Sequence, residues 1–228
     1  MSVLTKSPRI GLLLSGGLDS CILLGELLQL GYQVVPMYVQ SGLVWQEAEL
    51  SSLREFLRVL GNDAVEPLVI LDMPLDDVYG DHWSLTGCDV PDADSPDEAV
   101  YLPARNALLL VKASICCLPH RLEDLAIGIL GTSPFADAGG DFFDQFSKAM
   151  STSLSARIRL HRPFAGVTKQ EVMALGQGLP LKWTFSCLSP RQQLHCGECN
   201  KCAERRQAFR QADLEDHTEY AVVSPATR

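Results

Sequence analysis

One segment near the start of the chain reads Ile10-Gly11-Leu12-Leu13-Leu14-Ser15-Gly16-Gly17-Leu18-Asp19-Ser20. Its first five residues are mostly aliphatic, which is typical of a strand buried on both faces of a parallel sheet. Gly16 and Gly17 permit a tight turn whose backbone N–H groups can approach an anion without a Cβ in the way. Asp19 and Ser20 stand where the N-terminal cap and first turn of a helix belong. The segment therefore predicts a strand that leads into a phosphate-binding loop and then a helix.

Such a helix start offers unpaired N–H groups and a partial positive charge, so a pyrophosphate is a natural occupant, with the hydroxyls of Ser15 and Ser20 as further donors. Asp19 would repel phosphate unless Mg²⁺ lies between them. The glycine and lysine spacing of a Walker A loop is absent. An ordinary strand-to-helix turn is the alternative, and the complete six-residue string behind a buried strand disfavours it. The string resembles the PP-loop of ATP pyrophosphatases, which cleave ATP between the α- and β-phosphates.

Apolar runs alternate with amphipathic stretches over most of the chain. Strands are expected at residues 10–14, 33–39, 65–71 and 125–129, and helices at 19–30, 46–60, 101–118 and 141–154. Gly31 and Gly61 stand where helix C-caps belong, and the crossovers are long enough to make the strands parallel. This pattern predicts an α/β fold with a doubly wound, mainly parallel sheet in residues 1–180. Residues 181–228 are expected to form a small annex with a helix and a tail.

Ligands of such folds bind beyond the carboxyl ends of the strands. Residues 15–20, the stretch after Val39 and residues 131–140 are therefore expected to share one crevice. The acidic segment, residues 72–98, holds nine Asp or Glu and no Lys or Arg. It is expected to be a loop, either a mobile lid or a solvated excursion.

Length and charge limit the class of protein. At 228 residues the chain can bury one substantial core and carry a small appendage. Its net charge of −9 argues against broad nucleic-acid binding. The charge is uneven, because residues 157–210 hold 10 Lys or Arg against 3 Asp or Glu. This basic region is expected either to bind a triphosphate or an acidic substrate, or to be an ordinary solvated surface. Without a signal segment or an apolar run of membrane-spanning length, we expect a cytoplasmic protein with no membrane partner.

Four of the eight cysteines cluster near the C-terminus, with eight, two and two residues between them: Cys187, Cys196, Cys199 and Cys202. Four thiolates suit tetrahedral Zn²⁺, and a shell closed by sulfur suggests a structural rather than a hydrolytic site. Zinc of this kind contributes roughly 10–16 kcal/mol in finger-like peptides. His195 is a possible substitute ligand. The other cysteines are expected to be small hydrophobic residues in apolar surroundings or loops, namely Cys21, Cys88, Cys116 and Cys117.

The PP-loop and this cysteine series together resemble the 7-cyano-7-deazaguanine synthase family, and the likeness covers most of the chain. Leu102-Pro103-Ala104-Arg105-Asn106 resembles the family's Val-Pro-Gly-Arg-Asn helix entry. Asp144-x-Phe146-x-x-Ala149 and Cys202-x-x-Arg205 continue the likeness. The resemblance implies an adenine nucleotide alpha hydrolase-like, Rossmann-type fold. It also implies a homodimeric, zinc-containing, cytoplasmic enzyme of queuosine biosynthesis.

The reaction that the resemblance implies is ATP-dependent C–N ligation. ATP adenylates the carboxylate of 7-carboxy-7-deazaguanine, ammonia displaces AMP to form an amide, and a second activation dehydrates the amide to a nitrile. Asp19 on Mg²⁺ and two cationic clamps, Arg105 and Lys169, are the implied catalytic residues. Asn106 either acts in the site or only caps its helix. The implied ATP-binding residues are Leu14, Ser15, Gly16, Gly17, Leu18, Asp19, Ser20 and Cys21.

Two segments differ from the family. Ser41-Gly42-Leu43-Val44-Trp45 replaces a Gly-Gln-Arg-His-like run, and residues 135–143 replace a Gly-Tyr-Pro-Asp-Cys-Arg substrate loop. Both are expected to line the crevice, where Trp45, Phe142 and Phe143 either stack on a planar heterocycle or only pack. Three alternatives follow: a paralogue that joins its acid to a different amine, including one on a protein or peptide; a sulfur transferase; and a non-catalytic zinc module with a vestigial nucleotide loop.

Overall fold

Five parallel strands form the centre of the molecule, in the order β3-β2-β1-β4-β5. The computed structural model describes residues 7–221. The two longest strands lie in the interior of the sheet and are almost wholly buried, as their aliphatic sequences require. The α/β fold and parallel sheet predicted from the sequence are confirmed. The strands are β1 (Arg9–Leu13), β2 (Gln33–Gln40), β3 (Val69–Asp72), β4 (Asp124–Ile127) and β5 (Arg159–His161).

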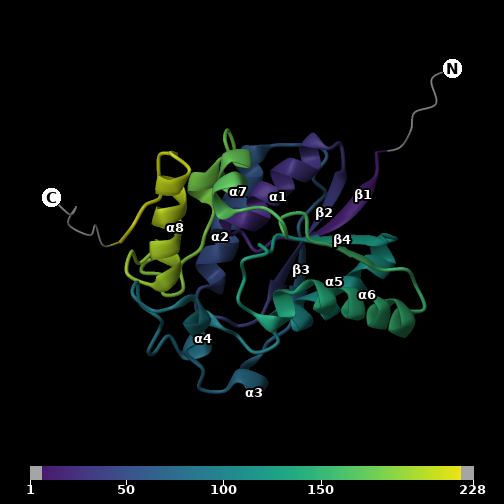
Figure 1. Cartoon of the computed structure of the whole chain (residues 1–228), viewed down its shortest axis with the longest axis horizontal. Coiled ribbons are helices and arrows are strands. Elements are labelled where there is room, and N and C mark those ends of the chain that lie inside the picture. The colour runs from purple at the N-terminus through teal and green to yellow at the C-terminus, as the bar shows by residue number, and fades with distance from the viewer. Residues whose placement is uncertain (1–6, 222–228) are drawn as a thin grey trace.

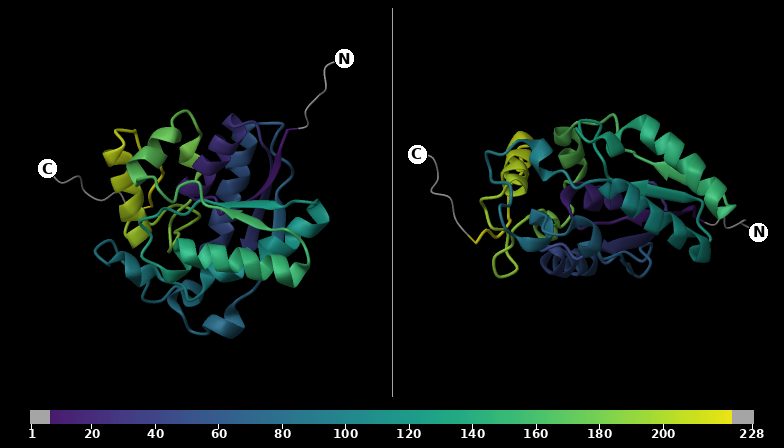
Figure 2. Two further views of the ribbon diagram at one scale, coloured as in Figure 1. Left: turned by 45° about the vertical axis from the view of Figure 1, so that its right-hand side comes forward. Right: turned by 90° about the horizontal axis from the view of Figure 1, so that it is seen from below.

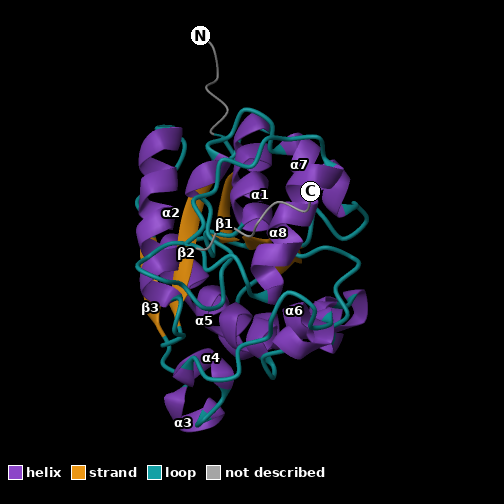
Figure 3. Ribbon diagram, turned by 90° about the vertical axis from the view of Figure 1, so that its left-hand side faces the viewer, coloured by secondary structure: helices purple, strands orange, loops and turns teal. Residues whose placement is uncertain are grey.

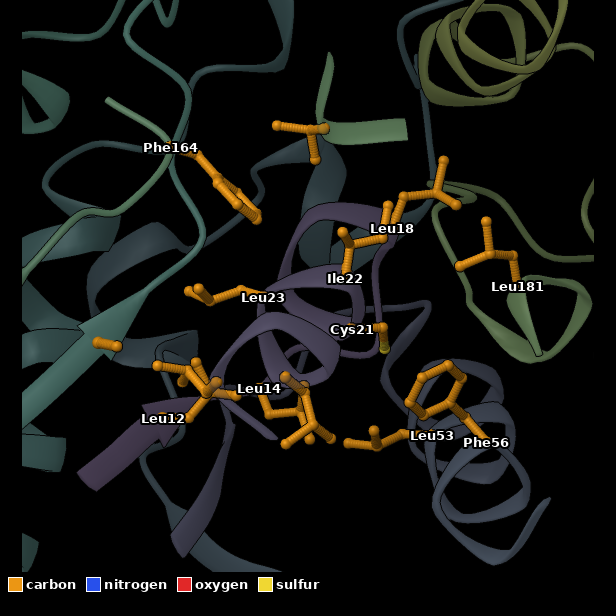
Figure 4. Close-up of a cluster of buried hydrophobic side chains, with 14 of the residues drawn as sticks. Leu12, Leu14, Leu18, Cys21, Ile22, Leu23, Leu53, Phe56, Phe164 and Leu181 are labelled. Atoms are coloured by element: carbon orange, nitrogen blue, oxygen red, sulfur yellow. The ribbon is translucent and has the colours of Figure 1, made fainter. Parts of the chain in front are cut away.

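Helices cover both faces of the sheet (Figures 1 and 3). One face packs against α1 (Leu18–Gln29) and α2 (Gln46–Leu60), and the other against α5 (Arg105–His120) and α6 (Gly140–Leu154). Figure 4 shows the first of these cores, in which Leu12, Ile22 and Phe56 from β1, α1 and α2 meet. The remaining helices are α3 (Asp76–Tyr79), α4 (Trp83–Thr86), α7 (Lys169–Leu175) and α8 (Asn200–Gln211), with 3-10 turns at Asp97–Val100, Ala136–Ala138 and Leu181–Trp183.

Two expected elements begin later than their patterns suggested. Val65 makes a single bridge to Val34, and the ladder of β3 starts only at Val69, because Pro67 between them has no N–H to donate. Helix α5 starts at Arg105 rather than at residue 101, because Ala104 has a left-handed backbone with φ of 55°. Strand β5 and helix α7 were not expected at all. Both are short, and Arg-Leu-His in β5 shows no apolar run.

The acidic segment contains the one-turn helices α3 and α4 and is bonded to the start of α8. The backbone N–H of Asn200 donates to the carbonyl of Pro91 at 3.0 Å, and its side-chain amide donates to the carbonyl of Ser95 at 2.7 Å. Asp92 also forms an antiparallel bridge with Cys199. The end of the segment nearest the crevice is thus attached to the cysteine-rich annex.

The topology explains where a ligand would lie. The chain moves outward from β1 through β2 to β3, and α5 then returns it to β4 on the other side of β1. The order of the strands therefore reverses between β1 and β4, and the loops that follow these two strands diverge there. Such a switch point opens a crevice at the carboxyl ends of the strands. No helix within residues 7–221 is both long and apolar enough to cross a bilayer.

Residues 181–187 connect helix α8 to the loop that follows β1. The N–H of Phe185 donates to the carbonyl of Gly16 at 2.8 Å. Arg205, fully buried on α8, donates to Leu181 O at 2.9 Å and to Thr184 Oγ1 at 2.8 Å. Its Nε donates to Thr218 Oγ1 at 2.7 Å. Helices α7 and α8 lie side by side at one end of the molecule, as Figures 1 and 2 show.

Arg205→Met should lower the free energy of unfolding by about 3 kcal/mol, because it leaves buried acceptors at Leu181 and Thr184 without their charged donor. Urea unfolding monitored by circular dichroism measures this. Arg210→Met, an exposed change on the same helix, is the control and should stay within about 0.5 kcal/mol of the parent. Equal stability of the two variants would contradict the bracing role of Arg205.

Candidate functional site

The loop after β1 presents a helix N-terminus to solvent at the switch point. Gly16 adopts φ of +88°, and Ser15 Oγ accepts from the N–H of Gly17 at 3.3 Å and lies 3.1 Å from Ser20 Oγ. Among residues 7–221, no side chain caps the first turn of α1. The N–H groups of that turn are therefore available to an anion, together with two hydroxyls.

Three of the predicted ATP-binding residues have side chains in the core. Figure 4 shows Leu14, Leu18 and Cys21 among the buried hydrophobic residues. Burial raises the pKa of the Cys21 thiol well above its usual range, which suits an inert packing residue. These three residues can contact a nucleotide in the loop only through their backbone.

A chain of ion pairs borders the loop. Lys169 Nζ, at the start of α7, lies 2.7 Å from Asp19 Oδ1 and 3.9 Å from Glu204 Oε1. Lys201 Nζ contacts the other oxygen of Glu204 at 2.5 Å. The structure thus brings together Asp19 and Lys169, which are 150 residues apart in the sequence. Lys201 and Glu204 were not identified as site residues from the sequence. The basic character of residues 157–210 was a general signal for Lys201 but not for Glu204.

Arg105 lies where three cavities meet, of about 330, 260 and 120 Å³. Its Nε is buried and has no hydrogen-bond partner among the described residues. The next residue, Asn106, fixes the start of α5, because its backbone N–H and side-chain amide both donate to the carboxylate of Asp137, at 3.0 and 3.2 Å. A guanidinium group that lines these cavities is well suited to an anionic ligand.

The largest of these cavities, which we call the crevice, is lined mainly by aromatic and loop residues. Trp45 and Trp83 stack with ring centroids 5.8 Å apart, and Tyr101 and Phe135 lie 5.3 Å apart. The crevice also contains Asp19 and residues 128–135, so the loop after β1, the stretch after β2 and part of residues 131–140 do share one site.

Of the two alternatives for Phe142 and Phe143, packing is the one observed, although the segment that contains them was expected to line the crevice. Phe143 is 3% exposed in the core between α6 and the sheet, and Phe142 packs beside it. Helix α6 begins at Gly140, so both residues lie in its first turn on the face toward the sheet. Trp45, by contrast, does line the crevice.

A second carboxylate borders the loop and was not anticipated. Glu49 Oε2, on α2, accepts from Tyr38 OH at 2.7 Å, and Glu49 lines the cavities of 260 and 120 Å³. Burial raises the pKa of Glu49 to about 7, against the opposing effects of Arg105 and the Tyr38 hydrogen bond. A signal did exist, because Glu49 shares the helix face of Leu53 and Phe56, both buried.

The four clustered cysteines converge as the metal hypothesis requires. All four are buried, and their sulfur atoms lie within 4.8 Å of one another. The Sγ atoms of Cys196 and Cys202 are 3.9 Å apart, close to the edge of about 3.8 Å expected for a tetrahedron with Zn–S bonds of about 2.3 Å. Backbone N–H groups donate to the sulfurs, for example Cys196 N to Cys187 Sγ at 3.1 Å. The donor set and its geometry fit a metal ion.

His195 and the other cysteines lie outside this set. His195 Nε2 accepts from the N–H of Ser186 at 3.2 Å, and its ring lies tilted against Phe185, with centroids 4.5 Å apart. Cys116 and Cys117 are buried, and burial raises the pKa of Cys117 to about 12. Cys88 is exposed in the acidic segment. Buried thiols with raised pKa values do not suit a sulfur-transfer role.

The family model and the curated relatives agree on one family. The model of the family described as "Queuosine biosynthesis protein QueC" matches residues 9–213. The chain is 29% identical to the 7-cyano-7-deazaguanine synthase of Methanocaldococcus jannaschii, over 91% of this chain and 97% of that protein. It is 32% identical to 7-cyano-7-deazaguanine synthase 1 of Desulfitobacterium hafniense, over 88% and 91%. Among solved structures, it is similar to the U34-tRNA thiolase NcsA of Methanococcus maripaludis, with 16% identity, 99% and 80% coverage and a TM-score of 0.49. The chain therefore belongs to the QueC family of queuosine biosynthesis proteins.

Proposed function

We propose that this chain is an ATP-dependent 7-cyano-7-deazaguanine synthase, a C–N ligase that converts 7-carboxy-7-deazaguanine and ammonia to the nitrile. The observation that carries the proposal is the uncapped, glycine-rich helix start at the switch point, with Lys169 and Arg105 beside it. Membership of the QueC family supports the substrate. As the family resemblance implies, we further propose a homodimer that works in the cytoplasm.

The site residues divide the chemistry between them. A carboxylate is a poor electrophile, so ATP must first convert it to a mixed anhydride, and the pyrophosphate that leaves carries developing negative charge. The N–H groups of the loop and the Ser15 and Ser20 hydroxyls would stabilise that charge. Asp19 would hold Mg²⁺ beside the phosphates, while Lys169 neutralises its remaining charge. Arg105 is placed to bind either a phosphate or the carboxylate of the acid.

The aromatic lining of the crevice favours an acid that carries a planar heterocycle. Its aromatic residues Trp45, Trp83, Tyr101 and Phe135 offer ring faces, and its volume of about 330 Å³ lies in the range of small-molecule sites. The acid and the nucleotide would meet at Arg105 and Asp19, which line both the crevice and the adjoining cavity at the loop.

A second candidate is the paralogue that uses a different amine. A further cavity of about 460 Å³ shares Leu130, Thr132 and Glu204 with the crevice and borders α8. It is far larger than ammonia requires. This observation favours testing a primary amine, such as the N-terminus of a glycine peptide, in parallel with ammonia.

Incubation with ATP, 7-carboxy-7-deazaguanine and ammonia should yield AMP, pyrophosphate and the nitrile, identified by mass. Lys169→Met should slow acid-dependent exchange of pyrophosphate into ATP by at least about tenfold, because a half-buried, hydrogen-bonded charge pair is broken. Lys148→Met, which changes an exposed lysine on α6, is the matched control.

In the incubation with ATP, 7-carboxy-7-deazaguanine and ammonia, nucleotide binding without AMP formation would reject this acid as the substrate. A conjugate with the peptide and no nitrile would favour the paralogue.

Gly128→Ala should weaken ATP binding. Gly128 follows β4 directly, and a Cβ there would lie 3.0 Å from the backbone carbonyl atoms of Asp19 and 3.1 Å from Ser20 Cα, so the loop would have to move. We expect at least about a tenfold rise in the Kd of ATP, measured by calorimetry. The control is Gly166→Ala, where an added Cβ meets nothing within 4 Å. Unchanged binding in both variants would show that the loop is not held by β4.

We also propose that the ion held by the four cysteines is structural zinc. One equivalent per chain is expected by elemental analysis, and Cys196→Ser should lose it and lower the unfolding midpoint by about 10 °C or more. Cys88→Ser changes an exposed thiol outside the cluster and should keep both the zinc and the midpoint. Retention of zinc by the Cys196 variant would contradict the assignment.

A further inference from the structure

We propose that the Glu49 carboxylate accepts the proton released when the nitrogen nucleophile attacks the activated acid. The inference rests on the proposed synthase activity and adds a residue and a role to it. The Glu49 carboxyl group lies beside the loop that follows β1, and within residues 7–221 no cationic side chain forms an ion pair with it.

Glu49 lies on the inner side of α2, next to the loop. A Cβ added to Gly16 would be 3.6 Å from Glu49 Cγ. The residue forms part of the lining of two cavities, and both also contain Ser15, Ser20 and Arg105. The carboxylate therefore borders the same space as the loop hydroxyls and the guanidinium that would hold the reactants.

The groups around Glu49 leave it able to exchange a proton. Tyr38 on β2 donates to it at 2.7 Å, Arg105 faces it from α5, and the Cys21 thiol lies nearby on α1. Within residues 7–221, no ion pair ties up its oxygens. The pKa of about 7 that burial produces is matched to proton transfer near neutral pH.

The other acids near the loop are less suited to this role. Asp19 is held by Lys169 at 2.7 Å, and Glu204 is held by Lys201. Burial raises the pKa of Tyr38 far above its usual range, so its phenol remains protonated and acts as a donor. Among the described carboxylates that line these cavities, Glu49 is thus the one that accepts a hydrogen bond from a side-chain hydroxyl, that of Tyr38, rather than from a cation or an amide.

The proton balance of the reaction requires an acceptor. The lone pair of ammonia attacks the acyl carbon, a C–N bond forms, and the bond from that carbon to the oxygen of AMP breaks with its electron pair on AMP. One N–H proton is left over, and it passes to Glu49 and then to solvent. In the second round the amide oxygen takes the adenylyl group, and two N–H protons leave as the nitrile forms and AMP departs. The first activation, in which a carboxylate attacks the α-phosphorus, releases no proton.

This difference separates a proton acceptor from a nucleotide-binding residue. In Glu49→Gln, acid-dependent pyrophosphate exchange should stay within about threefold of the parent, while amide and nitrile formation should fall by about 100-fold or more. Glu47→Gln, an exposed change on the same helix, is the control and should alter neither. Equal urea midpoints for the three proteins establish that the variants are folded.

Two further readouts report on the proton itself. Hydroxylamine is a weaker base than ammonia, so the N–H proton of its adduct passes to water more readily, and hydroxamate formation by Glu49→Gln should be impaired much less than amide formation. At a constant concentration of free ammonia, the rate of the parent should rise with pH through about 7, because Glu49 acts only when ionised. Glu49→Gln should lose this limb. Tyr38→Phe should move it to higher pH, because the hydrogen bond from Tyr38 lowers the pKa of Glu49.

The outcomes distinguish the inference from the proposed function. Absence of acid-dependent exchange in the parent would overturn the synthase activity, and the inference with it. Exchange in the parent with equal loss of exchange and amide formation in Glu49→Gln would overturn the inference alone, as would amide formation at the rate of the parent.

Discussion

The hydrogen bond from the N–H of Phe185 to the carbonyl of Gly16 connects the C-terminal part of the chain to the loop that follows β1. A loop that binds phosphate through its own N–H groups must hold those groups in place before the anion arrives, since any ordering on binding costs affinity. Gly16 has a left-handed backbone and no side chain with which to hold the loop in place. Support therefore comes from outside, from residues 181–187 on one side and from Gly128 on the other.

The metal site gives that support its rigidity. Cys187 ends the bracing segment, so an ion bound to it fixes the segment relative to α8, which begins directly after Cys199. Arg205 adds a second connection through Leu181 and Thr184. Four thiolates around a divalent ion leave a net charge of −2, and Cys202 is among the groups that favour the charged form of the buried Arg205. An ion bound at the four cysteines and the arginine would thus stabilise one another as well as the loop.

The sequence predicted those parts of the site that are local in the chain. Ser15–Ser20 and the cysteine series each lie within a short segment whose chemistry is evident without a fold. Lys201, Glu204 and Trp83 reach the site only through tertiary packing, and the very polar helix α8 offers no apolar stripe to place them. Residues 135–143 were predicted as one lining segment, but Phe142 and Phe143, in the first turn of α6, pack in the core. Glu49 was detectable as an acid on an apolar helix face, yet its role needs Tyr38 and Arg105.

The two halves of the site differ in how freely they can change. The nucleotide half consists of backbone at the ends of β1 and β4, where even one added methyl group meets the neighbouring main chain. The acid half consists of loop side chains, among them Trp45, Tyr101 and Phe135, which can be replaced without moving a strand. The proposed adenylation could therefore persist while the pocket for the acid is remodelled. Trp45 and Phe135, which come from the two segments in which this chain departs from the family pattern, both line the half that is free to vary.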